Sequence, residues 1–139
     1  MKNNMKEIYV DTNIFVEAIL KDNKKCQQIL EKIVNRELKA FTSVLTWDEL
    51  TFIIRKFISK EISILEGEKF LRFPNLIFLD AKKDVIQKAQ QLIEKYDLNP
   101  RDAIHIASAI HIRLKEIVSE DSDFDVVKEI KRISPRKFR

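Results

Sequence analysis

The stretch Ile8-Tyr9-Val10-Asp11-Thr12-Asn13, a short apolar run that ends in three polar residues, decides the fold of this chain. Its apolar residues do not alternate with polar ones, which is typical of a strand that is covered on both faces of a sheet. Further short runs rich in β-branched or aromatic residues follow it, and we expect each of them to form a strand. These runs lie at 40–41, 76–79 and 117–118, with a weak last one at Ile133.

Longer segments between these runs carry apolar residues at helical spacing. The spacing predicts amphipathic helices over 26–34, 44–59 and 85–96, and a shorter helix over 66–73 that Pro74 ends. Asn99 and Pro100 begin another helix, because Asn caps helix N-termini and Pro suits the first helical position. The segment 103–112 that follows them is apolar almost all round, so this helix is expected in the interior.

Strands that alternate with helices predict βαβ units, which build a parallel sheet with helices on both of its faces. The predicted fold class is therefore α/β, with three layers. The chain has 139 residues and carries no repeat, low-complexity segment or Pro/Gly/Ser-rich linker. A single domain over residues 1–139 is the expectation, since that length suits one domain and is short for two.

The composition excludes several classes of protein. The only glycine is Gly67, so the phosphate-binding loops of Rossmann dinucleotide binders and P-loop NTPases, which need several residues without a Cβ, are excluded, as are G-x-S-x-G hydrolases. The only cysteine is Cys26, which leaves no intrachain disulfide and no cysteine-rich zinc site. Without about 20 consecutive apolar residues there is no membrane span, and we expect a soluble, cytoplasmic protein.

Carboxylates follow the predicted strands or open the helices that connect them. Asp11 comes directly after the first strand, Asp121 follows the fourth, and Asp102 opens the interior helix. Glu49 lies in the first turns of the helix after the second strand, on its apolar side. Because functional groups gather beyond the carboxyl ends of parallel strands, we expect these four acids at one edge of the sheet. Carboxylates this close repel one another unless their pKa values rise or a cation binds. A site made of oxygen ligands alone favours Mg²⁺ or Mn²⁺, and these ions favour chemistry at phosphate esters.

The chain carries four short motifs in a fixed order along its whole length. They are Asp11-Thr12-Asn13, Thr46-Trp47-Asp48-Glu49-Leu50, Asp102-Ala103-Ile104-His105-Ile106-Ala107 and Ser119-Glu120-Asp121-Ser122-Asp123-Phe124. In this order the motifs resemble the PIN domain, particularly the compact VapC-like kind found as toxins and in archaeal genomes. No single motif is specific, and their order and placement carry the resemblance.

The resemblance implies a sheet of about five strands in the order 3-2-1-4-5 and a metal-dependent endoribonuclease that cleaves single-stranded RNA through a metal-activated water. It places the family's acidic quartet, which would hold Mg²⁺ or Mn²⁺, on Asp11, Glu49, Asp102 and Asp121. It places supporting polar positions on Thr12, Asn13, Ser119 and Asp123. Ser119 stands where the family more often has Thr and keeps the hydroxyl, while Asn13 is expected to orient Asp11 through a hydrogen bond.

Partners follow from charge, from the apolar surface and from the resemblance. Residues 126–139 hold six Lys or Arg and one acid, a net charge of +5, and this basic end is expected to hold the RNA backbone or to be a merely solvated terminus. The residues assigned to RNA binding are Arg132, Arg136, Lys137 and Arg139. The apolar residues of 52–71 favour a homodimer, and the VapC-like resemblance implies a cognate antitoxin.

Other interpretations of the same residues stay open. Asp11-Thr12-Asn13 also suits a helix cap, and Glu49 also suits a local ion pair with Arg55 or Lys56. His105 and His111 are interpreted as structural imidazoles rather than metal ligands, and Cys26 as a core residue. Trp47 is interpreted as a core or dimer-interface residue rather than a base-stacking platform.

Two rival functions remain at this point. One is a catalytically inactive PIN-fold RNA-binding or scaffold module, which has no need to keep mutually repelling carboxylates. The other is a haloacid-dehalogenase-like phosphatase, whose chemistry wants a second Asp where this chain has Asn13.

Overall fold

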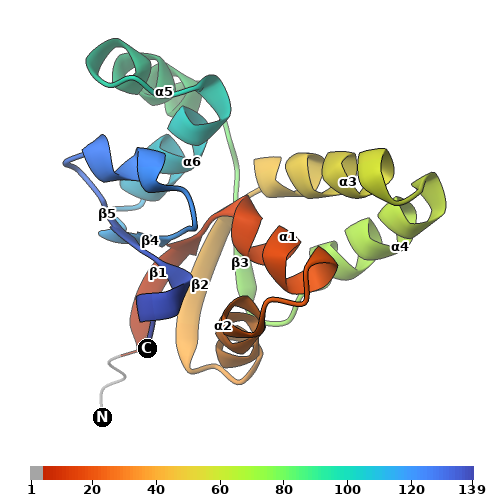
Figure 1. The fold of residues 1–139 in the computed structure, drawn as a ribbon. Coiled ribbons are helices and arrows are strands. Elements are labelled where there is room, and N and C mark those ends of the chain that lie inside the picture. The colour runs from red at the N-terminus through yellow and green to blue at the C-terminus, as the bar shows by residue number, and fades with distance from the viewer. Residues whose placement is uncertain (1–4) are drawn as a thin grey trace.

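A computed structural model describes residues 5–139, and its centre is a parallel sheet in the order β3-β2-β1-β4-β5 (Figure 1). In register, Tyr9 of the central strand pairs with Phe41 on one side and with Ile117 on the other. The predicted strand order is therefore confirmed. The strands are β1 (Lys6–Val10), β2 (Leu38–Ser43), β3 (Leu76–Leu79), β4 (Glu116–Val118) and β5 (Lys131–Ile133).

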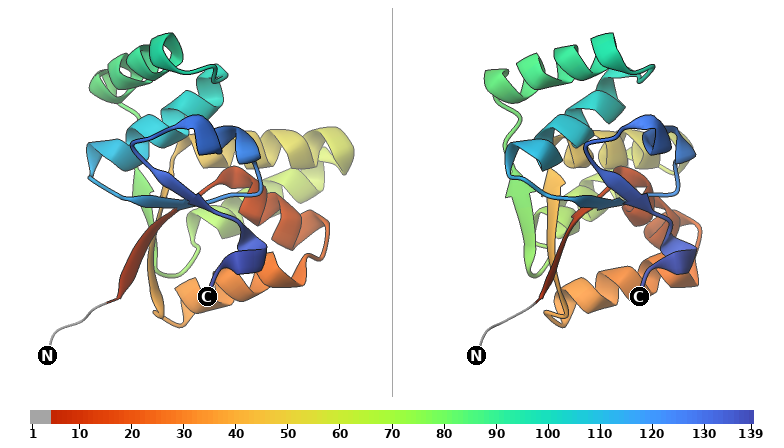
Figure 2. Two further views of the ribbon diagram at one scale, coloured as in Figure 1. Left: turned by 60° about the vertical axis from the view of Figure 1, so that its left-hand side comes forward. Right: turned by 90° about the vertical axis from the view of Figure 1, so that its left-hand side faces the viewer.

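Helices cover both faces of the sheet, which confirms the three layers. They are α1 (Thr12–Leu20), α2 (Lys24–Val34), α3 (Leu45–Phe57), α4 (Lys60–Leu71), α5 (Lys83–Lys95) and α6 (Pro100–His111), with 3₁₀ turns η1 (Ser122–Val126) and η2 (Pro135–Lys137). Successive side chains of β1 explain the two cores: Ile8 and Val10 pack with α1 to α4, and Tyr9 packs with α5 and α6. Figure 2 shows α5 and α6 above the sheet and α2 below it.

Two helices differ from the expectation. Helix α1 was expected only under the alternative in which Asp11-Thr12-Asn13 caps a helix, and its apolar residues Ile14, Phe15 and Ala18 are buried. The prediction for α4 was too short, because α4 begins at Lys60, where the side chain of Ser59 accepts a hydrogen bond from the backbone of Ile62. The strong cap outweighs the weak apolar periodicity of this segment.

Helices α3 and α4 form a hairpin that extends away from the sheet (Figure 1). Leu50 and Ile54 of α3 are buried as expected, but Trp47 is 42% exposed and Phe57 is 70% exposed. The core placement of Trp47 is therefore wrong, because its side chain lies over Gly67 of α4 and lines the open space between the two helices. Its place in a dimer interface stays a prediction. Gly67 lets the helices approach, since an added Cβ would lie 2.9 Å from Thr51 Cγ2.

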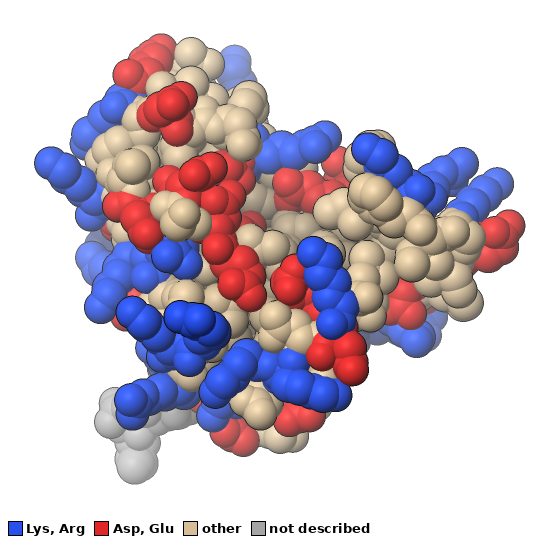
Figure 3. All heavy atoms as spheres, viewed as in Figure 1, with Lys and Arg blue, Asp and Glu red and all other residues tan. Residues whose placement is uncertain are grey.

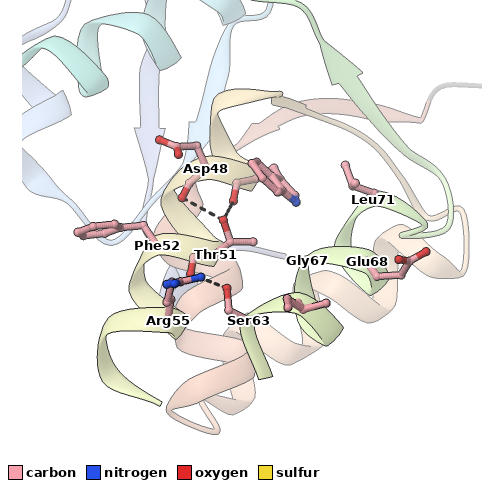
Figure 4. Close-up of a pocket in the computed structure, with 10 residues that line it drawn as sticks. Asp48, Thr51, Phe52, Arg55, Ser63, Gly67, Glu68 and Leu71 are labelled. Atoms are coloured by element: carbon pink, nitrogen blue, oxygen red, sulfur yellow. Dashed lines mark hydrogen bonds between the residues drawn. The ribbon is translucent and has the colours of Figure 1, made fainter. Parts of the chain in front are cut away.

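A cavity of about 480 Å³ lies between α3 and α4, and Figure 4 shows its lining. The Ser63 hydroxyl donates to the Thr51 carbonyl (2.8 Å) and links the two helices across it. Phe52 and Leu71 on its rim are more than half exposed. The hairpin thus exposes apolar side chains on both of its helices.

Across residues 5–139, every helix falls short of the length and apolar character that a membrane crossing requires.

Candidate metal centre

Asp11 lies where β1 ends and α1 begins, and its carboxylate is held on both oxygens. Oδ1 accepts a hydrogen bond from the backbone N–H of Thr12 (2.8 Å), so Asp11 caps α1. Oδ2 accepts from the Ser119 hydroxyl (2.6 Å) and from the Asn13 amide (3.1 Å). With only 5% of its surface exposed, Asp11 is a fixed carboxylate beside β4. The capping interpretation is thus confirmed, and it leaves the carboxylate in the predicted place.

Ser119 and Asn13 join the ends of β1 and β4. The Asn13 amide donates to the Ser119 hydroxyl oxygen (3.0 Å), and its carbonyl oxygen accepts from the Glu120 backbone (3.1 Å). The same Ser119 oxygen accepts from the Asp121 backbone (3.0 Å), and Asp121 in turn accepts from the backbone of Asp123 (2.9 Å). The hydroxyl at position 119 therefore places Asp121 beside Asp11.

Three carboxylates converge next to this junction. One oxygen each of Asp102, Asp121 and Asp123 lies within 4.8 Å of the others. Asp102 stands in the first turn of α6, where the side chain of Asn99 caps the helix as the sequence predicts, and Pro100 occupies the first helical position. Asp102 and Asp121 are half-buried and Asp123 is exposed. These three groups could hold a metal ion.

Glu49 points inward from α3, with 15% of its side chain exposed. Its Oε1 accepts hydrogen bonds from the Thr12 hydroxyl and from His105 Nε2, both at 2.6 Å. These contacts replace the local ion pair that a neighbouring basic residue offered as an alternative. His105 is 1% exposed and its Nδ1 lies 2.6 Å from the Tyr9 hydroxyl, so the prediction of a buried, hydrogen-bonded imidazole is confirmed for His105. The same prediction is wrong for His111, whose side chain is 53% exposed at the end of α6.

The electrostatics tie the four predicted acids to one site. Burial, followed by the charges of Asp11 and Asp121, raises the pKa of Asp102 to about 6, and Glu49 adds to the effect. Burial also raises the pKa of Asp11, against the opposing effects of His105 and Ser119. Burial opposes ionisation of Glu49 as well, but His105, Thr12 and Arg101 outweigh it and lower its pKa. Repulsion within such a set is relieved by proton uptake or by a bound cation.

A hollow of about 530 Å³ opens beside Glu49 and Asp102 and gives access to the site. Arg101, an exposed residue of α6, lines the same hollow. Figure 3 shows acidic side chains gathered at the centre of one face, with Lys and Arg around them. The face thus combines an acidic centre with basic surroundings.

The basic end divides into two parts. Arg132 is held beside the site, because its guanidinium donates twice to Asp125 (2.8 and 3.1 Å) and once to the Ser119 carbonyl (3.0 Å). Beyond β5 the chain turns toward α2, and the buried ring of Phe138 lies against Lys6 Nζ (5.0 Å to the centroid). Because Lys6 begins β1 and Asp11 follows its end, residues near Phe138 lie away from the carboxylates.

Comparison with known proteins identifies the family. The family model of the PIN domain matches residues 8–130. The chain belongs to the PIN domain family. This assignment agrees with the resemblance carried by the four sequence motifs and with the sheet order.

Two relatives of this PIN domain are ribonucleases of Methanocaldococcus jannaschii. Ribonuclease VapC6 is 23% identical over 141 residues, covering 86% of this chain and 92% of the relative. Ribonuclease VapC2 is 26% identical over 130 residues, covering 85% and 87%. A toxin–antitoxin complex from Klebsiella pneumoniae contains a chain of similar fold, with a TM-score of 0.69, 20% identity, and coverage of 94% of this chain and 99% of that one.

Two residues at the site of this PIN domain escaped the sequence analysis. Tyr9 belongs to the apolar run of the first strand, and nothing in that run distinguishes a polar contact from core packing. Arg101 precedes Asp102 directly, which was a usable signal, since a basic residue beside a predicted metal ligand is suited to a phosphate substrate.

Proposed function

We propose that this PIN domain is a Mg²⁺- or Mn²⁺-dependent endoribonuclease that cleaves single-stranded RNA, either as a VapC-like toxin or as an RNA-processing nuclease. The observation that carries the proposal is the approach of Asp102, Asp121 and Asp123 to within 4.8 Å at the sheet edge that also holds Asp11 and Glu49. An all-oxygen donor set of this kind suits a hard divalent cation. Relationship to two ribonucleases supports the reaction class.

The predicted quartet would hold the ion directly or through water, with Asp123 as a further ligand. When bound, such an ion polarises a phosphate and lowers the pKa of a coordinated water. The chain supplies rigid placement: Asn13, Ser119 and the Thr12 backbone fix the carboxylate of Asp11. Burial raises the pKa of Asp11, which means that its ionised form is costly in the folded protein. A bound cation would stabilise that ionised form.

Single-stranded RNA would reach this site along the basic surroundings of the acidic centre. The residues proposed to hold its phosphates are Arg132, beside the site, and Arg136, Lys137 and Arg139, as the net charge of this segment suggests. The last three lie toward the start of β1 and would meet a more distant part of the strand. Arg101 joins them, because it lines the hollow beside Asp102. Phosphate contacts would position the strand without selecting its sequence.

Cleavage of an unstructured RNA by the purified protein tests the proposal. Cuts should appear with Mg²⁺ or Mn²⁺ and stop with EDTA, and Asp11→Asn and Glu49→Gln should abolish them while the circular dichroism spectrum is unchanged. Asp48→Asn is the matched control, because Asp48 is the exposed neighbour of Glu49 on α3. Undiminished cleavage in EDTA contradicts the metal dependence, and full activity of Asp11→Asn contradicts the site.

Two protein partners belong to the same proposal. An antitoxin is supported by the toxin–antitoxin complex among the structures of similar fold. A homodimer is supported by the apolar surface of the α3–α4 hairpin, where Phe57 and Leu71 are 70% and 58% exposed. Light scattering of the purified chain, with Phe57→Glu as the variant, tests the dimer: the variant should be monomeric.

The alternative is a catalytically inactive PIN-fold module that binds RNA or serves as a scaffold. RNA binding without any cleavage over a range of Mg²⁺ and Mn²⁺ concentrations would favour this alternative. The mutually repelling acids argue against this alternative. A protein without catalytic activity gains nothing from a carboxylate whose pKa is raised by its neighbours, as that of Asp102 is.

A further inference from the structure

A buried polar chain runs from the central strand to the candidate metal centre. The Tyr9 hydroxyl lies 2.6 Å from His105 Nδ1, and His105 Nε2 lies 2.6 Å from Glu49 Oε1. Tyr9 is fully buried and His105 is 1% exposed, and their rings meet edge to face with centroids 5.7 Å apart. Three elements, β1, α6 and α3, thus meet through two short hydrogen bonds.

The chemistry of the partners determines where the ring hydrogen lies. An ionised carboxylate only accepts hydrogen bonds, so a separation of 2.6 Å from Glu49 Oε1 requires a hydrogen on His105 Nε2. The Tyr9 hydroxyl can donate to a bare Nδ1 or accept from a protonated one. In both states of the ring, Nε2–H therefore points at Glu49, and both ring nitrogens are occupied. His105 has no lone pair left for a metal ion.

Both hydrogen bonds to Glu49 reach the same oxygen. Thr12 donates to Oε1 at 2.6 Å, as His105 does, and within residues 5–139 no hydrogen bond reaches Oε2. Thr12 also binds Asp11 through its backbone N–H, so the orientation of Glu49 is tied to that of Asp11. Glu49 and Asp102 line the same hollow. The Glu49 oxygen that has no protein partner can bind a ligand there.

We propose that Tyr9 and His105 are positioning residues that hold Oε1 of Glu49 within the protein and leave Oε2 as its one oxygen for the metal ion. The inference rests on the proposed function, because it assigns the way in which one of the proposed ligands is presented. Hydrogen-bonding partners of metal ligands typically contribute about 10- to 100-fold to metal affinity. The same range is expected here for His105, and a smaller part of it for Tyr9, which acts only through the ring.

Direct measurement of Mn²⁺ binding tests this role, with electron paramagnetic resonance of the free ion as the readout. His105→Leu should weaken Mn²⁺ binding by about 10- to 100-fold. His105→Gln should recover part of the loss, because its amide can donate to Oε1 in place of Nε2–H. Tyr9→Phe keeps the ring and removes only the hydroxyl, so it should weaken binding less than His105→Leu. Ile106→Val, a buried neighbour on α6, is the matched control and should bind as the wild type does.

A double-mutant cycle separates positioning from a general loss of structure. In a Glu49→Gln background, His105→Leu should cause no further loss of Mn²⁺ affinity, because its effect passes through that carboxylate. An equal loss in both backgrounds, or unchanged affinity in His105→Leu and Tyr9→Phe, overturns the inference while the proposed function stands. Failure of the wild type to bind Mn²⁺ overturns both. Should His105→Leu not fold, Tyr9→Phe and His105→Gln decide the outcome by the same comparison.

Discussion

Replacing Asp102 with Asn should stabilise the metal-free protein at neutral pH, although the change removes a proposed metal ligand. Burial, followed by the charges of Asp11 and Asp121, raises the pKa of Asp102 from 3.8 to about 6. A carboxyl group with a raised pKa in the folded state binds protons more tightly there than in the unfolded chain. The cost of its charge is therefore absent below about pH 4, grows as the pH rises, and is fully present above about pH 6.

The magnitude follows from the size of the shift. About two pKa units correspond to about 3 kcal/mol at 1.36 kcal/mol per unit. Asp102 is only half-buried, and screening by water reduces the usable part to about half of that value. The substitution also loses the interaction of a first-turn carboxylate with the α6 N-terminus, about 0.5 kcal/mol. The net expectation is a free energy of unfolding higher by about 1 kcal/mol, or a Tm higher by about 3 °C.

Urea unfolding in EDTA at pH 7.5 and at pH 4 measures this difference. Asp102→Asn should exceed the wild type at pH 7.5 and lose its advantage at pH 4. Asp48→Asn, at an exposed first-turn carboxylate of α3, should not exceed the wild type at either pH, because it loses only the same interaction with a helix N-terminus. Added Mg²⁺ should then stabilise the wild type by mass action and the variant much less. The reasoning is refuted if Asp102→Asn is less stable than the wild type in EDTA at pH 7.5, because the charge of Asp102 would then not carry the cost of burial and repulsion that its raised pKa implies.

Three further predictions concern other parts of the chain. The double substitution Lys137→Gln/Arg139→Gln in an inactive background should flatten the salt slope of RNA binding by about 1.4 if both charges meet phosphates, as filter binding at several salt concentrations would show. Phe70→Ala removes a side chain that is 2% exposed and should lower the free energy of unfolding by about 3 to 5 kcal/mol in urea titrations. Gly67→Ala places a Cβ 2.9 Å from the Thr51 side chain, and a loss of about 1 kcal/mol is expected because overpacking outweighs the higher helix propensity of Ala.

Much of the site was predictable from local sequence. Asp11 and Asp121 follow strands, and the Asn99-Pro100 pair marks the helix start that carries Asp102. Such signals are local, because a strand end or a helix cap depends on the few residues around it. Parallel strands then bring residues that are far apart in the chain to one edge of the sheet.

The surroundings of these acids were less predictable. Glu49 was expected to point inward, but its hydrogen bonds to Thr12 and His105 depend on how α1, α3 and α6 pack around the sheet. Tyr9 gave no polar signal within an apolar strand, because its hydroxyl acquires a partner only when α6 covers that face. Asp123 was assigned a supporting place, whereas η1 brings one of its carboxylate oxygens within 4.8 Å of those of Asp102 and Asp121.

Periodicity alone predicted an α/β chain with a parallel sheet, because the spacing of apolar residues is a property of short stretches of sequence. Composition excluded glycine-rich phosphate loops, because the chain has one glycine. Packing between distant elements decided the rest. Trp47 stays 42% exposed, although it lies on the apolar stripe of α3, because its side chain lies over Gly67 of α4 and lines the open space between the two helices. Phe138 turns the basic end toward Lys6 because its ring is buried near the start of β1. Amphipathic periodicity identifies the face of a helix that can be buried. The neighbouring elements determine how much of that face they cover.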